Sequence, residues 1–272
     1  MTLPHTVVVT GASSGIGRAA AIEFARRGAG VVLVGRDQSR LDGALSLVRA
    51  EAGKKEPVAY RADFTRLDDV HGLVDHLKQR YERIDVLANN AGGLAGRHSV
   101  TADGFEMTIQ TNHLAGFLLS NLLREQLRNG RIINTASGAH AIGALDPANL
   151  RGEQKIGMWR AYGNSKQANI LFAAEAARRW PDILSTSYHP GFVRSRFGSV
   201  IGINRIVLPL WFVKTPVEGA DTMVWLASTP KAQLTNGGYY YQRKEQRPAR
   251  QAADPQLAAK LWEASLAAVD LS

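Results

Sequence analysis

The chain has 272 residues, of which 45% are hydrophobic and 21% are charged, and this composition is ordinary for a folded globular protein. It contains no cysteine, which excludes disulfides, thiolate catalysis and thiolate metal sites. The formal net charge of +9 would suit either an anionic partner or a solvated basic surface. We interpret the excess of basic residues as an ordinary solvated surface, because these residues are scattered and lack the interleaved aromatic side chains that bind nucleic acid.

Short apolar runs alternate with helical patterns along the chain. The runs that predict buried strands lie at residues 6–10, 30–35, 57–61, 84–88 and 131–135. The helical patterns lie at residues 16–27, 37–50, 67–81 and 105–127. Strands that are apolar throughout and separated by helices indicate a parallel sheet with helices on both faces, and right-handed crossovers make it doubly wound. No linker or repeat divides the chain, so we expect a single Rossmann-type α/β domain over residues 1–272.

A glycine-rich turn, residues 10–17, follows the first predicted strand and opens the first predicted helix. Such turns also close ordinary strand–helix joints. In this position, however, glycines let the backbone approach a pyrophosphate, and the helix N-terminus supplies amide donors and a partial positive charge. The spacing Gly-x-x-x-Gly-x-Gly differs from the commoner Gly-x-Gly-x-x-Gly and points to a particular superfamily of dinucleotide-binding enzymes.

Tyr162 and Lys166 lie four residues apart at the start of a predicted helix, so their side chains share one face. An ammonium beside a phenol favours the phenolate, and we expect it to lower the pKa of Tyr162 from about 10 towards neutrality. That pKa would suit an acid/base near pH 7. Tyr240 and Lys244 have the same spacing, but their strand-like, basic segment has no helical pattern, and we interpret that pair as surface residues.

With these motifs in order, the chain resembles the short-chain dehydrogenase/reductase superfamily, in its shorter single-domain branch. The resemblance covers nearly the whole chain. The motifs that carry it are residues 10–17, residues 89–92, Asn112, Ser137, the Tyr162/Lys166 pair and the Pro190-Gly191 turn. Residues 159–162, 165–169, 189–191 and 261–262 look like the retinol dehydrogenase-like group, which acts on lipophilic carbonyls and alcohols, although Gly35 stands where that group often has a cysteine.

The resemblance implies a catalytic set. Ser137 would hold the substrate carbonyl against Tyr162, and Lys166 would also bind the nicotinamide ribose. Asn112 would hold a water that relays protons to Lys166, although by itself it could be an ordinary polar residue of a helix. The resemblance implies no metal ion.

The resemblance also implies a bound nicotinamide cofactor. Residues 90–92 would stabilise the sheet and pass the adenine ribose, Asp63 would contact the adenine, and Val193 would bind the carboxamide through its backbone. The expected cofactor contacts are Gly11, Ser13, Ser14, Gly15, Ile16, Gly17, Arg36, Asp63, Asn90, Ala91, Gly92, Tyr162, Lys166, Pro190, Gly191 and Val193.

Arg36 bears on the choice between NADP and NAD. An acidic residue at the end of the second strand would bind the ribose hydroxyls of NAD and repel a phosphate. Gly35 provides none, and Arg36 can offer a bidentate fork to the 2′-phosphate of NADP. Asp37 complicates this interpretation, but its position suits a cap of the next helix. We expect NADP in preference to NAD.

An apolar segment at residues 197–213 follows the Pro190-Gly191 turn, where this superfamily places a lid over the substrate. It could cover an apolar substrate, touch a membrane surface or form a contact between copies in a homo-oligomer. The segment contains Asn204, Arg205 and Pro209, and it is shorter than the about 20 apolar residues that a membrane-spanning helix needs, so we do not expect it to cross a membrane. With no signal peptide at its start, the chain is expected to be cytoplasmic and to have no transmembrane segment.

Other classes of protein share parts of this pattern. Extended-branch epimerases and dehydratases use Tyr-x-x-x-Lys, but with a different glycine spacing and a longer C-terminal domain; enoyl reductases space the Tyr and Lys more widely. A non-catalytic NADP sensor is the main alternative, although such proteins usually lose Ser137, Tyr162 or Lys166. The sequence therefore predicts an NADP(H)-dependent oxidoreductase that moves a hydride between nicotinamide and a small-molecule, apolar carbonyl or alcohol, with Tyr162 as acid/base.

Overall fold

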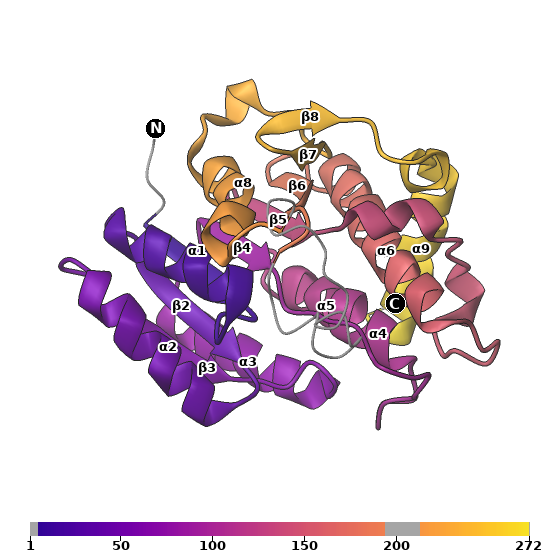
Figure 1. Cartoon of the computed structure of the whole chain (residues 1–272), viewed down its shortest axis with the longest axis horizontal. Helices are drawn as coiled ribbons and strands as arrows, with labels where there is room; N and C mark the ends of the chain where they lie inside the picture. Colours follow the sequence, from indigo (N-terminus) through magenta and orange to yellow (C-terminus); the bar gives the residue numbers. More distant parts are fainter. Residues whose placement is uncertain (1–4, 194–212, 272) are drawn as a thin grey trace.

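An eight-stranded sheet forms the centre of the part of the chain that the structure describes (Figure 1), which is residues 5–193 and 213–271 of a computed structural model. The strand order is β3-β2-β1-β4-β5-β6-β7-β8, and every pair is parallel except β7–β8. The strands are β1 Thr6–Thr10, β2 Gly30–Gly35, β3 Val58–Arg61, β4 Val86–Asn89, β5 Arg131–Thr135, β6 Leu184–His189, β7 Tyr239–Tyr241 and β8 Lys244–Gln246. The expected doubly wound α/β fold is confirmed, with one antiparallel strand at its edge.

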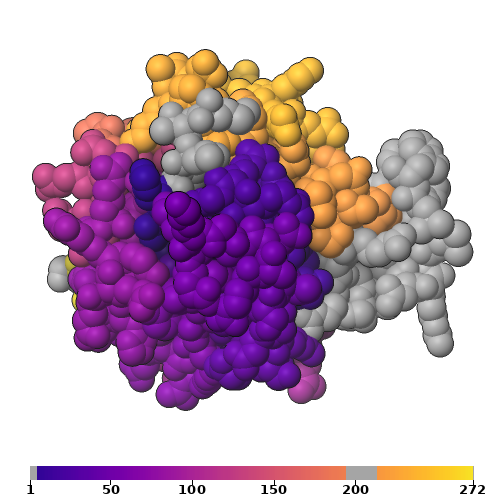
Figure 2. Space-filling view, turned by 90° about the vertical axis from the view of Figure 1, so that its left-hand side faces the viewer, coloured from indigo at the N-terminus to yellow at the C-terminus, as the bar shows by residue number. Residues whose placement is uncertain are grey.

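Helices cover both faces of this sheet (Figure 1). They are α1 Gly15–Arg26, α2 Gln38–Glu51, α3 Leu67–Arg80, α4 Met107–Ile109, α5 Ala115–Leu122, α6 Met158–Arg179, α8 Pro216–Ser228 and α9 Pro255–Ala268. In the space-filling view of Figure 2, the N-terminal elements form the centre of one face, and the chain after residue 213 runs above and beside them.

The alternation of side chains along the strands divides the core in two. In β1, the side chain of Val8 joins a cluster with α3, α5, α6 and α9, whereas Val7 and Val9 join a cluster with α1, α2 and α8. All three valines are fully buried. A strand that is apolar on both sides needs helices on both faces, which is why the continuous apolar runs predicted this architecture.

The order of the strands reverses at β1, which pairs with β2 on one side and β4 on the other. In open parallel sheets, ligands bind at this switch point, beyond the carboxyl ends of the strands. The glycine-rich turn follows β1, Asn90 follows β4, Ser137 follows β5 and Pro190 follows β6. The parallel pairing of β1, β4, β5 and β6 therefore brings motifs from across the chain to one edge of the sheet.

Two expectations were wrong in detail. The helical pattern at residues 105–127 is interrupted: α4 and α5 are separated by a π-helical turn, Gln110–Leu114, and the helix ends at Leu122. Tyr240 is not a surface residue, because β7 is an inner strand and leaves it only 3% exposed, with its hydroxyl accepting from the amide of Thr235. The segment expected as a lid lies outside the described residues apart from Val213.

Candidate active site

The glycine-rich turn leaves the N-terminus of α1 open. Gly11 and Gly15 have φ of 67° and 55°, a left-handed conformation that side chains rarely adopt. Ser14 is the N-cap of α1 but its side chain makes no capping hydrogen bond, and the first turn of the helix carries no acidic residue. Amide donors at this end therefore keep the capacity to bind an anion such as a pyrophosphate.

Gly17 allows α1 to press against the loop that follows β4. A Cβ added to Gly17 would lie 2.5 Å from the carbonyl oxygen of Gly11 and 2.6 Å from Nδ2 of Asn90. Asn90 Nδ2 donates to the carbonyl oxygen of Thr10 at 2.9 Å, and the amides of Asn90 and Ala91 both donate to the Thr10 hydroxyl. The expected role of Asn90 in stabilising the sheet thus has a physical basis, and Thr10 is a partner that the sequence did not single out.

Asn112, in the π-helical turn, joins the loop after β4 to α6. Its Nδ2 donates to the carbonyl oxygen of Gly93 and to the hydroxyl of Ser165, each at 2.9 Å, and its Oδ1 accepts from the amide of Gly93 at 2.8 Å. A Cβ on Gly92 would lie 2.6 Å from this Oδ1. The hydroxyl of Ser165 in turn donates to the carbonyl oxygen of Tyr162. A π-helical turn is a frequent feature of functional sites, and here it directs a buried amide at the helix that carries Tyr162 and Lys166.

Ser137, Tyr162 and Lys166 lie together beyond the end of β5. Ser137 lies two residues after the strand, and its side chain is hydrogen-bonded to Tyr162. Lys166 is 4% exposed; its ammonium lies 5.5 Å from the centroid of the Tyr162 ring and donates to the carbonyl oxygen of Thr135 at 3.0 Å. Asn169, one turn further along α6, donates to the same oxygen. These two hydrogen bonds to one carbonyl of β5 hold α6 against the sheet and thereby fix the position of Tyr162.

The electrostatics of this pair differ from expectation. Burial raises the pKa of Tyr162 to about 12, although the hydrogen bond with Ser137 lowers it. Burial also lowers the pKa of Lys166 from 10.5 to about 8. Removing the two groups from water disfavours the charged form of each. The expected near-neutral pKa of Tyr162 was therefore wrong: the phenol is protonated at pH 7, and the ammonium beside it is still the major form of Lys166.

Arg36 lies beside the glycine-rich turn, at the end of β2. It is exposed, and it has no hydrogen-bonding or ionic partner among the residues that the structure describes. Asp37 accepts from the amide of Arg40 at 3.0 Å and so caps α2, as the sequence suggested. A Cβ on Gly35 would lie 3.2 Å from Cβ of Ser13, which places the end of β2 against the turn.

Asp63 follows β3, the strand beside β2. Its Oδ1 accepts from the amide of Thr65 at 3.1 Å, and its own amide donates to Asp69. The side chain is thus held at the same edge of the sheet as Arg36, half-buried, with one carboxylate oxygen not used by that turn.

The Pro190-Gly191 turn follows β6 and reaches α8. Gly191 has a φ of 88°, and a Cβ there would lie 2.9 Å from Cδ of Lys214. Val193 forms a parallel bridge with Lys214. A Cβ on Gly219 of α8 would lie 2.7 Å from Val193 and 3.1 Å from Ile16, so these two side chains flank one glycine. Val193 and Ile16, which are far apart in the sequence, therefore both lie against Gly219 of α8.

Large apolar side chains are exposed on the segments that carry these polar groups. Ile142, in the turn after Ser137, is 55% exposed, Phe192 is 77% exposed, and Trp159, one helical turn before Tyr162, is 43% exposed. A Cβ on Gly163 would lie 3.2 Å from Ile142, so this isoleucine packs on α6 next to Tyr162. Apolar groups grouped around a polar centre are typical of sites for apolar small molecules.

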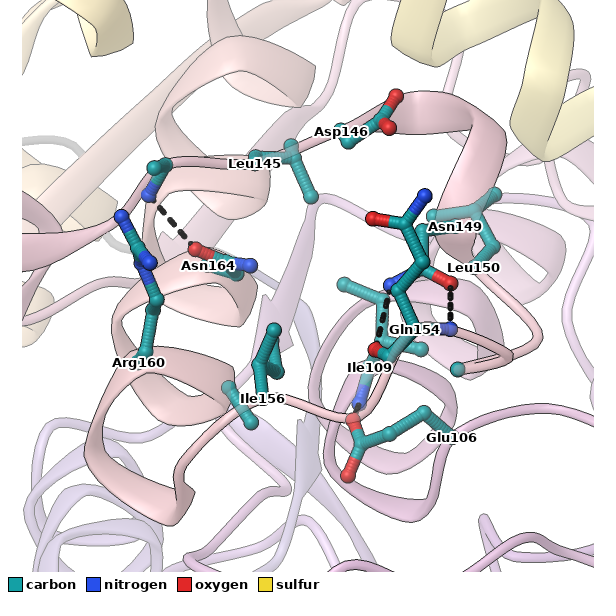
Figure 3. A pocket seen from close by; sticks show the side chains of 13 residues that line it. Glu106, Ile109, Leu145, Asp146, Asn149, Leu150, Gln154, Ile156, Arg160 and Asn164 are labelled. Atoms are coloured by element: carbon teal, nitrogen blue, oxygen red, sulfur yellow. Dashed lines mark hydrogen bonds between the residues drawn. The ribbon is translucent and has the colours of Figure 1, made fainter.

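A cavity of about 190 Å³ lies against α6 (Figure 3). Arg160 and Asn164 line it from α6, and the amide of Ala144 donates to Oδ1 of Asn164. Glu106 and Gln154 lie across the cavity, on other segments. Its lining contains none of the expected catalytic residues, because positions 160 and 164 face away from positions 162 and 166 on a helix.

The part of the chain that the structure describes contains neither a metal centre nor a helix that could span a membrane. Within residues 5–193 and 213–271, no three His, Asp or Glu side chains are arranged to hold a metal ion. Among the helices described, none is both long and apolar enough to cross a bilayer.

Comparisons with known proteins agree on one family. Residues 5–202 match the family model described as short chain dehydrogenase. The chain is 53% identical to a Streptomyces sp. (strain C5) protein named "Putative daunorubicin C-13 ketoreductase DnrU", over 97% of this chain and 92% of that protein. It is 37% identical to retinol dehydrogenase 14 of Homo sapiens, over 98% of this chain and 86% of that protein. A solved structure of a short-chain dehydrogenase from Sphingobium yanoikuyae in complex with NADPH aligns with a TM-score of 0.66 and 30% identity, over 82% of this chain and 84% of that chain.

Proposed function

The chain belongs to the short-chain dehydrogenase family, and we propose that it is an NADP(H)-dependent reductase or dehydrogenase of lipophilic substrates, with Tyr162 as its acid/base. Membership of the family makes the protein an oxidoreductase that transfers a hydride to or from carbonyl or alcohol groups. The cofactor preference, the catalytic residues and the lipophilic substrate are the parts that we propose.

One observation carries the proposal: the hydrogen-bonded pair of Ser137 and Tyr162, with the ammonium of Lys166 at 5.5 Å from the phenol ring. A hydroxyl that is both protonated at pH 7 and close to a fixed cation is suited to give up a proton to a developing alkoxide. A non-catalytic sensor would have no need of this arrangement.

The residues at the switch point fit a dinucleotide. The open N-terminus of α1 suits the pyrophosphate, and Gly11, Gly17 and Gly92 stand where a Cβ would meet backbone or amide atoms within 3 Å. A bound nicotinamide would supply the hydride in reduction and accept it in oxidation. Of the expected contacts, Ser13, Ser14, Gly15 and Ile16 would meet the pyrophosphate, Asp63 the adenine, and Pro190, Gly191 and Val193 the nicotinamide.

The chain's own residues would then handle the proton. In reduction, Ser137 holds the carbonyl oxygen of the substrate, and the phenol of Tyr162 donates its proton to that oxygen as the carbon accepts the hydride. The ammonium of Lys166 stabilises the phenolate that this leaves, and Asn112 holds the loop and the helix in register. In oxidation, the phenolate takes the proton back from the alcohol.

The preference for NADP rests on Arg36. Its guanidinium has no partner among the described residues, lies beside the glycine-rich turn and is suited to a 2′-phosphate. Asp37, the alternative ribose contact, is engaged as the cap of α2. The NADPH complex of the Sphingobium relative is consistent with this choice.

The preference for lipophilic substrates rests on exposed apolar side chains: Ile142 and Trp159, which lie close to Tyr162 along or against α6, and Phe192, in the turn after β6. Burying such groups against an apolar substrate stabilises its complex by about 25 cal/mol per Å². The names of the Streptomyces and human relatives refer to a ketoreductase and to a retinol dehydrogenase, and both support this substrate class.

The test is the decrease of NADPH absorbance with purified protein and a panel of carbonyls that runs from short aldehydes to polycyclic ketones and polyene aldehydes, repeated with NADH. We expect turnover with the large apolar members and a preference for NADPH. Binding of NADPH without turnover on any member would favour the sensor instead, and preference for small polar carbonyls would refute the substrate class.

A further inference from the structure

His189 is the last residue of β6 and lies between two loops of the site. Its Nδ1 accepts a hydrogen bond from the amide of Gly138 at 3.2 Å and another from the amide of Gly191, also at 3.2 Å. Gly138 directly follows Ser137, and Gly191 belongs to the turn expected to face the nicotinamide. One nitrogen atom thus links the segment that positions the substrate carbonyl to the segment that positions the cofactor.

The imidazole ring is fixed by packing as well. It stacks on Tyr241 of β7, with ring centroids 4.9 Å apart and an interplanar angle of 21°. A Cβ on Gly138 would lie 3.3 Å from Nε2 of the imidazole, so Gly138 closes over the ring. The ammonium of Lys214 lies 4.9 Å from the centroid of the Tyr241 ring. The ring therefore has little freedom to rotate and release either amide.

His189 can accept from both amides only when Nδ1 carries no proton. Burial, together with the nearby His140 and Lys214, lowers its pKa to about 4, so the neutral ring is the form present at pH 7. A neutral ring with its proton on Nε2 accepts both bonds without a competing charge.

We propose that His189 is a positioning residue for hydride transfer: through its double acceptor Nδ1 it sets the distance between the Ser137 segment and the nicotinamide-facing turn. This inference rests on the proposed function. Errors of about 1 Å in the placement of reacting groups cost roughly a hundredfold in rate, so loss of this link should reduce kcat while leaving the distant adenosine contacts intact.

Two variants separate the acceptor from the ring. His189→Asn keeps an acceptor oxygen near the position of Nδ1 but removes the ring that stacks on Tyr241, whereas His189→Phe keeps a stacking ring but removes the acceptor. We expect His189→Phe to lower kcat by roughly ten- to hundredfold, with the Kd for NADPH changed by less than about threefold. His189→Asn should recover most of the kcat. If only the stacked ring mattered, His189→Phe would keep most of the kcat and His189→Asn would lose it.

His76 provides the matched control, since it also stacks on a tyrosine, Tyr60, at 5.4 Å and 13°, but lies on α3. The variants His76→Asn and His76→Phe should leave kcat unchanged. If His189→Phe lacks a cooperative unfolding transition, His189→Ala takes its place in the comparison with His189→Asn.

The amide proton shifts of Gly138 and Gly191 in NMR spectra supply a readout that does not depend on turnover. Both amides should lose their hydrogen-bonded shift together in His189→Phe and keep it in His189→Asn. Wild-type kcat in His189→Phe, equal loss in the Asn and Phe variants, or unchanged amide shifts would overturn the inference. Absence of turnover in the wild type would instead refute the proposed function, while the NMR comparison would still decide whether His189 holds the two loops.

Discussion

Replacing Arg36 with alanine tests the cofactor preference at a single side chain. In the structure, the guanidinium has no ionic or hydrogen-bonding partner among the described residues, so its removal breaks no hydrogen bond or ion pair there and should leave the fold unchanged. A charge-assisted hydrogen bond contributes about 1.5–3 kcal/mol, which is about ten- to hundredfold in affinity. Because Arg36 is exposed, solvent screens the interaction and we expect the lower end of that range.

The assay is a pair of dissociation constants, for NADPH and for NADH, measured by fluorescence titration. Arg36→Ala should weaken NADPH by about tenfold and leave NADH nearly unchanged, and the difference should shrink as salt is raised. Arg40→Ala is the matched control: it removes the same charge four residues later, from an exposed arginine that pairs with Asp37. Gly35→Asp is a poorer test, because a Cβ there would lie 3.2 Å from Ser13 and 3.3 Å from Leu41.

A wild type that prefers NADH, or equal weakening of both cofactors in Arg36→Ala, would show that Arg36 does not contact the 2′-phosphate. Equal weakening would mean that the guanidinium contacts a part that the two cofactors share. In that case Arg18, an exposed residue on the first turn of α1, becomes the candidate for the phosphate contact.

Three further predictions concern the catalytic groups and the substrate. The rate of carbonyl reduction should fall as the pH rises through about 8, because the ammonium of Lys166 that stabilises the phenolate is present only below that pKa. The variant Lys166→Arg stays charged and should lack this fall. A wild-type pH–rate profile that is flat to pH 10 would contradict the role of Lys166. Asn112→Ala should lower both kcat and the free energy of unfolding, the latter by about 1–3 kcal/mol, because three hydrogen bonds of a buried amide are lost. The control Asn121→Ala on α5 removes one hydrogen bond and should lower stability alone. Urea unfolding measures stability and initial rates measure kcat, and an unchanged kcat in Asn112→Ala would refute its role. Across a series of n-alkanals, kcat/KM should rise by up to about fourfold per methylene, since each buried CH₂ contributes about 0.8 kcal/mol, and a flat or inverted trend would exclude an apolar site.

Apolar runs predicted the first half of the fold well and the second half poorly. Strands β1 to β5 lie within two residues of their expected limits, because β-branched, aliphatic or aromatic residues predominate in each. Strand β6 was not located, since Ser185, Thr186 and Ser187 are buried there without an apolar run. The burial of Tyr240 was also missed, because its basic neighbours suggested a surface segment although β7 lies inside the sheet.

The positions of the candidate site could be predicted from sequence, but its electrostatics could not. The glycine-rich turn, Asn90, Ser137 and the Pro190-Gly191 turn were assigned to one site by resemblance, and the parallel pairing of the strands before them explains why they converge. The spacing of Tyr162 and Lys166 showed that they share a helix face, yet it carried no information on burial, which sets the pKa of both groups. Nothing in the sequence indicated that His189 accepts hydrogen bonds from two amides, or that Asn112 lies in a π-helical turn, because both features depend on the folded backbone.

The most direct test of the account is the turnover number of Tyr162→Phe beside that of Tyr240→Phe. Both changes remove one hydroxyl from a largely enclosed ring, but only Tyr162 is hydrogen-bonded to Ser137 and close to Lys166. General acid–base catalysis contributes about 10²–10⁴-fold, so kcat with NADPH and an apolar ketone should fall by at least that range in Tyr162→Phe, with NADPH binding retained, and should be nearly unchanged in Tyr240→Phe. Near-normal turnover in Tyr162→Phe, or a large loss in Tyr240→Phe alone, would contradict the account.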